Sequence, residues 1–115
     1  MHELGIANSV VEAVRNEALR RPGARVRKVG MRLGELAGVD RDALTFCFDS
    51  LVHDTELAGV VLEIEPRPRR HRCRVCAESF FVMDYQTACP RCRCRDTECI
   101  SGEELELSYL ELEEP

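Results

Sequence analysis

The stretch Cys73–Cys92, CRVCAESFFVMDYQTACPRC, contains two CxxC pairs separated by twelve residues. Each pair places two thiolates on one tight turn, so together they can form a tetrahedron of sulfur around a d¹⁰ metal ion. A site of four cysteines with no open position is typical of structural zinc. The spacing therefore predicts a zinc site that folds a segment with little core of its own. Its ligands are Cys73, Cys76, Cys89 and Cys92.

Two further cysteines, Cys94 and Cys99, follow this stretch. Either could replace Cys92 as a ligand, pair with the other under oxidation, or pack as an ordinary small side chain. We favour packing or exposure, because the CxxC pairs already supply four ligands. A disulfide-exchange role is disfavoured, because two pairs in register indicate metal. We expect His71, just ahead of the first pair, to be a solvated neighbour rather than a ligand.

Two amphipathic helices precede the cysteine-rich segment. The first is predicted over Glu3–Arg20 and ends before Pro22-Gly23, and the second follows Asp40, a candidate N-cap. Cys47 lies on the apolar face of the second helix and is expected in the core. The apolar positions at helical spacing are Leu4, Ala7, Val11, Val14 and Ala18, then Leu44, Cys47, Phe48 and Leu51.

Three strands show alternation of apolar and polar residues. The first contains Val29, Met31 and Leu33, and the second contains Val60, Leu62 and Ile64 and stops at Pro66. The third begins at Leu105, and a change of phase predicts a bulge near Tyr109–Leu110. Residues 67–102 show neither period, although Phe80-Phe81 is typical of a short strand between the two cysteine pairs.

This order predicts an α+β fold: two helices on a three-stranded, mainly antiparallel sheet, with an inserted zinc-ribbon or rubredoxin-like zinc subdomain. Because the last strand returns to the sheet after the insert, the domains are nested. Residues 1–66 and 103–115 form one α/β domain, and residues 67–102 form the inserted zinc-binding domain.

Composition narrows the class of protein. The chain has 115 residues, 5% aromatic and no Trp, so its core is small and aliphatic. No stretch approaches the roughly 20 apolar residues that span a bilayer, and no secretory h-region is present. We therefore expect a cytoplasmic protein without a membrane partner. In a reducing cytosol, clustered cysteines hold metal more often than they form disulfides.

The charge distribution raises a second hypothesis. The net charge is -5, yet residues 67–95 carry eight of the sixteen basic residues. A zinc ribbon flanked by arginines is also a nucleic-acid-binding design, and this is our alternative. The acidic tail at residues 103–114 would repel phosphate, so nucleic acid is the weaker hypothesis. We find no phosphate loop, HExxH motif or nucleophile–base pair, and therefore expect no enzyme.

The first three residues, Met1, His2 and Glu3, offer a nitrogen-rich chelate. Its donors are the terminal amine, the His2 amide nitrogen and imidazole, and a fourth donor from the Glu3 amide or carboxylate. A square-planar set of this kind is favoured by Ni(II) or Cu(II). Metal and protons compete for these donors, so the site would hold its metal reversibly, which suits transport.

Several stretches, in this order, resemble the HypA/HybF family of hydrogenase-maturation nickel chaperones across nearly the whole chain. They are MHELGIANSVVEAV at 1–14, MRLGELAGVDRDALTFCF at 31–48, LEIEP at 62–66 followed by CxxC and CPxC, and SGEELELSYLELE at 101–113. One departure concerns the residue after each CxxC, often Gly in such turns, which is Ala77 or Arg93 here.

The resemblance implies a function and a set of ligands. Met1, His2 and Glu3 match the nickel-binding start of the family, and the four cysteines of the CxxC pairs match its structural zinc ligands. The family delivers nickel to the large subunit of [NiFe] hydrogenase together with a HypB-type GTPase, and some members also serve urease. We expect a monomer or weak dimer.

Overall fold

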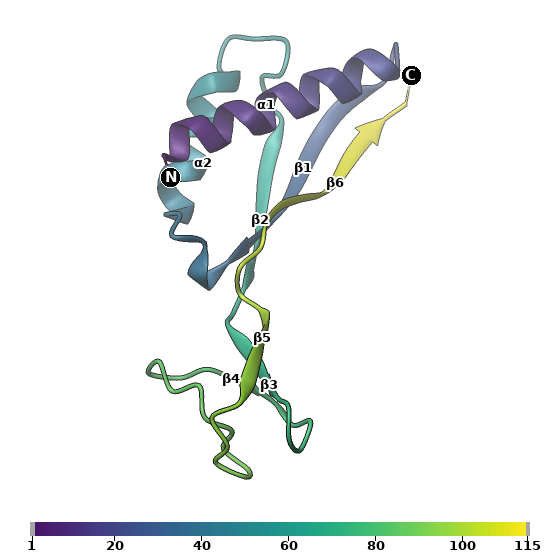
Figure 1. Ribbon diagram of the computed structural model, residues 1–115. Coiled ribbons are helices and arrows are strands. Elements are labelled where there is room, and N and C mark those ends of the chain that lie inside the picture. Colours follow the sequence, from purple (N-terminus) through teal and green to yellow (C-terminus); the bar gives the residue numbers. More distant parts are fainter. Residues whose placement is uncertain (1, 115) are drawn as a thin grey trace. The chain divides into compact units, whose positions relative to one another are not determined.

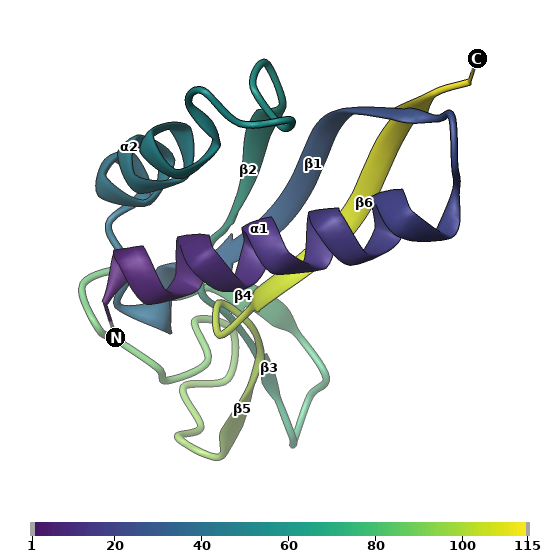
Figure 2. The same ribbon diagram turned by 90° about the horizontal axis from the view of Figure 1, so that it is seen from above.

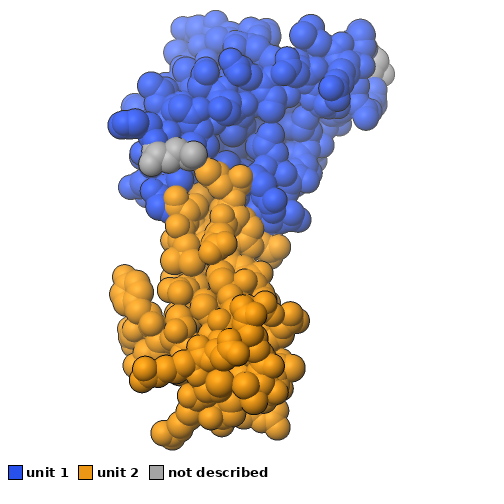
Figure 3. All heavy atoms as spheres, viewed as in Figure 1, with its two compact units in different colours: residues 1–32, 38–65, 106–115 blue, residues 33–37, 66–105 orange. Residues whose placement is uncertain are grey.

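The computed structural model describes residues 2–114 and divides into two compact units (Figure 3). Unit 1 comprises residues 1–32, 38–65 and 106–115, and unit 2 comprises residues 33–37 and 66–105. Unit 2 thus contains residues 33–37, 66 and 103–105 besides residues 67–102, the insert that the sequence predicts. That these units act as separate metal-binding domains remains a prediction.

The helices and strands lie along the chain as Figure 1 shows. They are α1 (Glu3–Arg20), β1 (Arg25–Gly34), the 3₁₀ turn η1 (Glu35–Ala37), α2 (Arg41–Val52), β2 (Val61–Arg67), β3 (Arg70–Cys73), β4 (Ser79–Phe81), β5 (Thr97–Ser101) and β6 (Leu105–Glu113). The first helix has the predicted bounds. Pro66 does not end the second strand, which continues to Arg67.

Unit 1 is built on a sheet with strand order β2-β1-β6, which α1 crosses (Figure 2). Arg27 pairs with Glu113 and Arg32 with Glu106, so β1 and β6 run antiparallel. Lys28 pairs with Glu63 and Arg32 with Glu65, so β1 and β2 run parallel and α2 is the crossover between them.

The core of unit 1 is aliphatic, as the composition predicts. Val29 and Met31 of β1 are buried, as is Leu33 of the same strand, which belongs to unit 2; the alternating residues Lys28 and Arg32 are not buried. The helices contribute Ile6, Ala7, Val10, Val11 and Val14 from α1 and Leu44, Phe48 and Val52 from α2. Burying each larger aliphatic side chain stabilises the fold by about 1.5–3 kcal/mol. Packing of these side chains therefore holds the helices against the sheet.

The second helix begins as predicted. The side chain of Asp40 accepts a hydrogen bond from the Ala43 N–H at 3.0 Å, which satisfies one of the unpaired donors at the helix start. Cys47 is half-buried on this helix rather than fully in the core.

Unit 2 contains a small antiparallel sheet with strand order β4-β3-β5. His71 lies opposite Phe80 of β4 and Cys99 of β5, and a register shift occurs beside it at Arg70. The strand at Phe80-Phe81 is confirmed, and β5 was not predicted. The α+β fold class with its cysteine-containing insert is confirmed, and the exception to antiparallel pairing is β1 with β2. In the described residues no helix is long and apolar enough to cross a membrane.

Candidate metal centres

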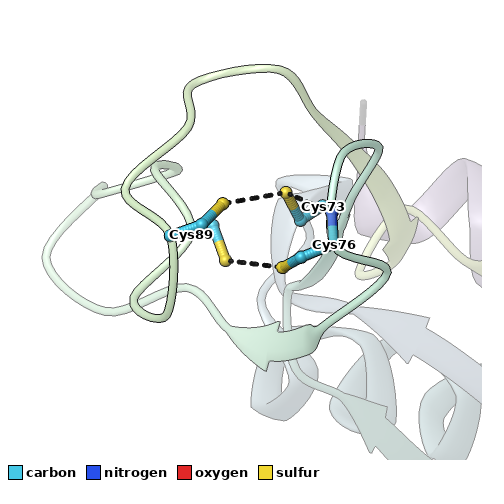
Figure 4. Close-up of side chains that lie close together, drawn as sticks. Cys73, Cys76 and Cys89 are labelled. Carbon is cyan, nitrogen blue, oxygen red and sulfur yellow. Dashed lines mark hydrogen bonds between the residues drawn. The ribbon is translucent and has the colours of Figure 1, made fainter.

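The four cysteines of the CxxC pairs lie together in unit 2. Figure 4 labels three of them, Cys73, Cys76 and Cys89. The sulfur atoms of all four lie within 4.8 Å of one another. The Sγ atoms of Cys73 and Cys92 are 3.5 Å apart, and those of Cys76 and Cys89 are 3.6 Å apart. A zinc ion with bonds of about 2.3 Å to four sulfurs needs sulfur–sulfur separations of about 3.8 Å. The four side chains therefore fit a tetrahedral zinc ion.

Both CxxC turns have the same backbone form. Ala77 and Arg93, which follow the two pairs, have φ values of 64° and 65°. Each donates its N–H to the carbonyl of the first cysteine, Ala77 to Cys73 at 3.0 Å and Arg93 to Cys89 at 2.7 Å. Neither residue is a glycine, so the turns hold side chains in the left-handed region at some conformational cost. The departure from Gly thus leaves the turn geometry intact.

The thiols of this cluster affect one another's ionisation. Hydrogen bonds from the backbone of Cys76 and then Val75 lower the pKa of Cys73 to about 7. The backbone of Cys94 favours ionisation of Cys92, but the neighbouring sulfur of Cys73 and desolvation outweigh it and raise the pKa of Cys92 to about 12. The pKa of Cys89 is also lowered, chiefly by a hydrogen bond from the backbone of Cys92. Two thiols therefore ionise readily, whereas a full set of four thiolates requires a cation among them.

His71 is buried, so the expectation of a solvated side chain was wrong. Its Nδ1 lies 3.0 Å from the hydroxyl of Thr97, and its Nε2 accepts a hydrogen bond from Arg69 Nε at 3.3 Å. Thr97 donates its own hydroxyl proton to the carbonyl of Thr87, so it accepts from Nδ1–H. Desolvation, followed by the charge of Arg69, lowers the pKa of His71 and keeps the ring neutral. His71 therefore ties β3 to β5 and leaves metal binding to the cysteines.

The remaining cysteines of unit 2 lie outside the four-sulfur group. Cys94 is half-buried, and its Sγ accepts the N–H of Asp96 at 3.4 Å. Cys99 is exposed on β5, where its thiol donates to the carbonyl of Ser101 at 3.3 Å. These positions agree with the preference for packing or exposure over metal ligation.

At the N-terminal candidate site, Met1 lies outside the described residues. His2 is exposed and is the N-cap of α1, and its side chain makes no capping hydrogen bond. Its carbonyl accepts the N–H of Ile6 at 3.2 Å, so the backbone alone anchors the helix start. The imidazole is therefore available to a ligand.

Glu3 is held by the second helix. Its Oε2 accepts the backbone N–H of Asp40 at 3.2 Å. Because Asp40 is the N-cap of α2, this bond joins the N-terminal ends of the two helices, and the carboxylates offset the partial positive charge of both ends. The sequence identified Asp40 as a cap but carried no signal for its pairing with Glu3.

A family model described as "Hydrogenase/urease nickel incorporation, metallochaperone, hypA" matches residues 1–112. The chain belongs to the HypA family. The hydrogenase maturation factor HypA of Geobacter metallireducens is 42% identical over 98% of this chain and 100% of its own length. That of Roseiflexus sp. is 42% identical over 99% of this chain and 94% of its own.

Two solved HypA structures share this fold. One, a solution structure of a HypA protein, has a TM-score of 0.71 and 21% identity and covers 97% of this chain and 96% of its own. The other, the nickel metallochaperone HypA from Helicobacter pylori, has a TM-score of 0.65 and 19% identity, with full coverage of both chains. The function of the family to which the chain belongs is nickel incorporation. The alternative of a nucleic-acid-binding module is not favoured.

Proposed function

We propose that this protein binds Ni(II) at its N-terminus and delivers it for assembly of [NiFe] hydrogenase. The donors are the amine of Met1, the amide nitrogen and imidazole of His2, and the Glu3 backbone amide. Support comes from the HypA family match and from the exposed His2 imidazole, which is not used as a helix cap. Four nitrogen donors in one plane suit Ni(II), and protonation of the amine and imidazole releases it.

The resident metal in this proposal is zinc, held by Cys73, Cys76, Cys89 and Cys92. A bound zinc ion supplies the positive charge that lets four thiolates coexist, and it gives unit 2 a centre that its small apolar content does not provide. The chain's own contribution is to orient the sulfurs, through the backbone hydrogen bonds of the two CxxC turns. With every ligand position filled by sulfur, this metal is structural.

The protein then acts by transferring cargo, without a catalytic step of its own. The partners proposed are a HypB-type GTPase and the hydrogenase large subunit, with action in the cytoplasm. Urease is a second destination that the family description includes.

A metal titration tests the nickel site. Untagged protein with zinc bound is titrated with Ni(II) by calorimetry, alongside His2→Ala and a variant with one residue added ahead of Met1. The first change removes the imidazole, and the second moves the amine out of the chelate, so both should lose tight nickel binding while zinc content stays constant. His53→Ala is the matched control, because that histidine is exposed at the end of α2. Unchanged nickel affinity in the His2 variant contradicts the proposed site.

A further inference from the structure

Unit 2 carries a groove that neither metal centre explains. Its volume is about 530 Å³, and its apolar wall includes Phe80, Phe81, Met83 and Pro90. Phe81 and Met83 are 58% and 70% exposed, which is unusual for two large apolar side chains so close in sequence. Apolar surface gathered at one concave place is typical of a binding site.

The exposed side chains stand on a defined turn. Met83 and Gln86 form a β-bridge, and the N–H of Gln86 donates to the Met83 carbonyl at 3.0 Å. Asp84 and Tyr85 between them have φ values of 51° and 61°, the signature of a type I′ turn built without glycine. The Arg70 guanidinium lies 5.4 Å from the centre of the Phe81 ring. The turn therefore sets the backbone at Met83, and Arg70 packs against the ring of Phe81.

The charge around the groove is of one sign. Arg93 and Arg95 line it, both are exposed, and no acidic side chain lines it. Within residues 2–114, neither of these arginines has an ion-pair partner. The arginines of β3 and its following turn differ, since Arg72 pairs with Glu98 and Arg74 with Asp96. The groove thus combines its apolar wall with two arginines that have no acidic partner in the described part of the chain.

We propose that this groove binds an extended acidic segment of a partner protein. One apolar side chain of the segment occupies the space between Phe81, Met83 and Pro90, and its flanking carboxylates pair with Arg93 and Arg95. Bidentate pairing of arginine with carboxylate provides orientation, and the apolar anchor provides most of the affinity. A nucleic acid fits less well, because two arginines line the groove rather than an extended row of cations, and the whole chain carries a net charge of -5.

The test uses zinc-loaded full-length protein and a fluorescein-labelled peptide, GDEELFDEDG, with binding followed by anisotropy. The comparison peptides are GDEEGSDEDG, which lacks the apolar anchor, and GKKRLFKRKG, which has the opposite charge. We expect saturable binding of the first peptide only, weakened by added salt. ¹⁵N chemical shifts should change at Met83 and Arg95 and stay constant at Arg72.

Variants of the lining residues distinguish peptide binding in this groove from nonspecific electrostatic attraction to the protein. Arg95→Glu and Met83→Ser should each weaken peptide binding by about tenfold, since each removes a principal contact. Arg91→Glu is the matched control: it makes the same charge change in an exposed residue of the same loop that does not line the groove. Zinc content, measured for every variant, reports that unit 2 is folded.

Three results would overturn the proposal. The first is absence of saturable peptide binding, and the second is that Arg91→Glu weakens peptide binding as much as Arg95→Glu does. The third is that a twelve-nucleotide oligothymidylate binds more tightly than the acidic peptide and that this binding is lost in the Arg95→Glu variant. The last result would assign the groove to nucleic acid. None of these outcomes depends on nickel, so the proposed nickel function stands or falls separately.

Discussion

The carboxylate of Glu3 accepts the backbone N–H of Asp40 at 3.2 Å, and this bond joins the starts of α1 and α2. Asp40 in turn caps α2 through Ala43. The residue next to the proposed nickel ligand His2 is thus positioned by an element far along the chain. The sequence left three roles open for Glu3: amide donor, carboxylate donor, or support of the helix start. The structure favours a supporting role for its side chain.

We therefore predict that Glu3→Gln keeps nickel binding and Glu3→Ala weakens it. The amide oxygen of Gln can still accept the Asp40 N–H, whereas Ala leaves that donor without its partner and costs about 1 kcal/mol of stability. Nickel calorimetry and thermal unfolding of zinc-loaded protein provide the two readouts. If Glu3→Gln loses nickel as completely as His2→Ala, the carboxylate is itself a ligand.

The zinc ligand set predicts a clear division among the cysteines. Cys92→Ser should lose stoichiometric zinc, because its sulfur lies 3.5 Å from that of Cys73 within the four-sulfur group. Cys94→Ser and Cys99→Ser should keep it, because neither sulfur belongs to that group. Metal analysis after gel filtration gives the content. Zinc loss from Cys94→Ser, with zinc retained in Cys92→Ser, would reverse the assignment.

Removal of zinc by a chelator should act on unit 2 alone. We expect amide hydrogen exchange to become fast in β3 and β5, because unit 2 has few buried apolar side chains besides Val82 and the cysteines. The amides of α1 should stay protected by the aliphatic core of unit 1. Equal loss of protection in α1 would show that the two units fold only together.

Local sequence patterns correctly predicted the structural features that depend on residues close together in the chain. The helix over Glu3–Arg20, the cap at Asp40 and the alternation at Val29, Met31 and Leu33 are confirmed. The four-sulfur group was also predictable, because CxxC spacing fixes local geometry and leaves two turns to meet.

Features that depend on distant partners were not predictable. The exposure pattern of β6 changes phase at Glu106–Leu107, and a bulge near Tyr109–Leu110 stays a prediction. The spacing of apolar residues indicates that the alternation along the strand changes phase, but pairing with the neighbouring strand determines where this occurs. The burial of His71 likewise depends on β5, which has no periodic pattern of its own. The parallel pairing of β1 with β2 follows from the crossover through α2, which periodicity does not describe.

Glycines of unit 1 offer a stability test. A Cβ added at Gly30 would overlap the ring of Tyr109, so Gly30→Ala should destabilise by about 1–3 kcal/mol through displacement of that ring. Gly5→Ala meets no atom within 4 Å and should stabilise the helix by about 0.5 kcal/mol. Chemical denaturation measures both. In a Tyr109→Ala background the cost of Gly30→Ala should nearly disappear, and an unchanged cost would place its cause elsewhere.

The CxxC turns give a matched pair of substitutions. Arg93→Gly removes the conformational cost of a non-glycine residue at positive φ. Arg91→Gly changes a residue without positive φ and brings only the entropy cost of glycine. We expect the Arg93 variant to be more stable than the Arg91 variant by about 1 kcal/mol. Thermal unfolding of zinc-loaded proteins measures the difference. Equal stabilities would mean that the turn does not strain Arg93.

The hydrogen bond from Tyr109 to Glu63, at 2.8 Å, predicts a pH dependence. This bond, with desolvation and the Glu63 charge, raises the pKa of the Tyr109 phenol above its usual value, and it lowers the pKa of Glu63. The unfolded chain therefore loses the phenol proton first. Stability from this bond is complete between the usual pKa of Glu63, 4.5, and a pH of about 10. It falls as pH rises from about 10 through the pKa of Tyr109 in the folded protein, and also as pH falls below 4.5 through the lowered pKa of Glu63.

Absorbance titration of a Tyr85→Phe variant isolates Tyr109, because the chain has two tyrosines. Its phenol should ionise at higher pH than a free tyrosine. Adding Glu63→Gln removes the negative charge and should return the midpoint toward the ordinary value, because ionised Tyr109 then meets no opposing carboxylate at that position. Lys28 pairs with Glu63 at 3.1 Å and is left in place, so the shift reports the carboxylate itself. A midpoint unaffected by Glu63→Gln would mean that desolvation and the charge of Glu111, not Glu63, raise the Tyr109 pKa.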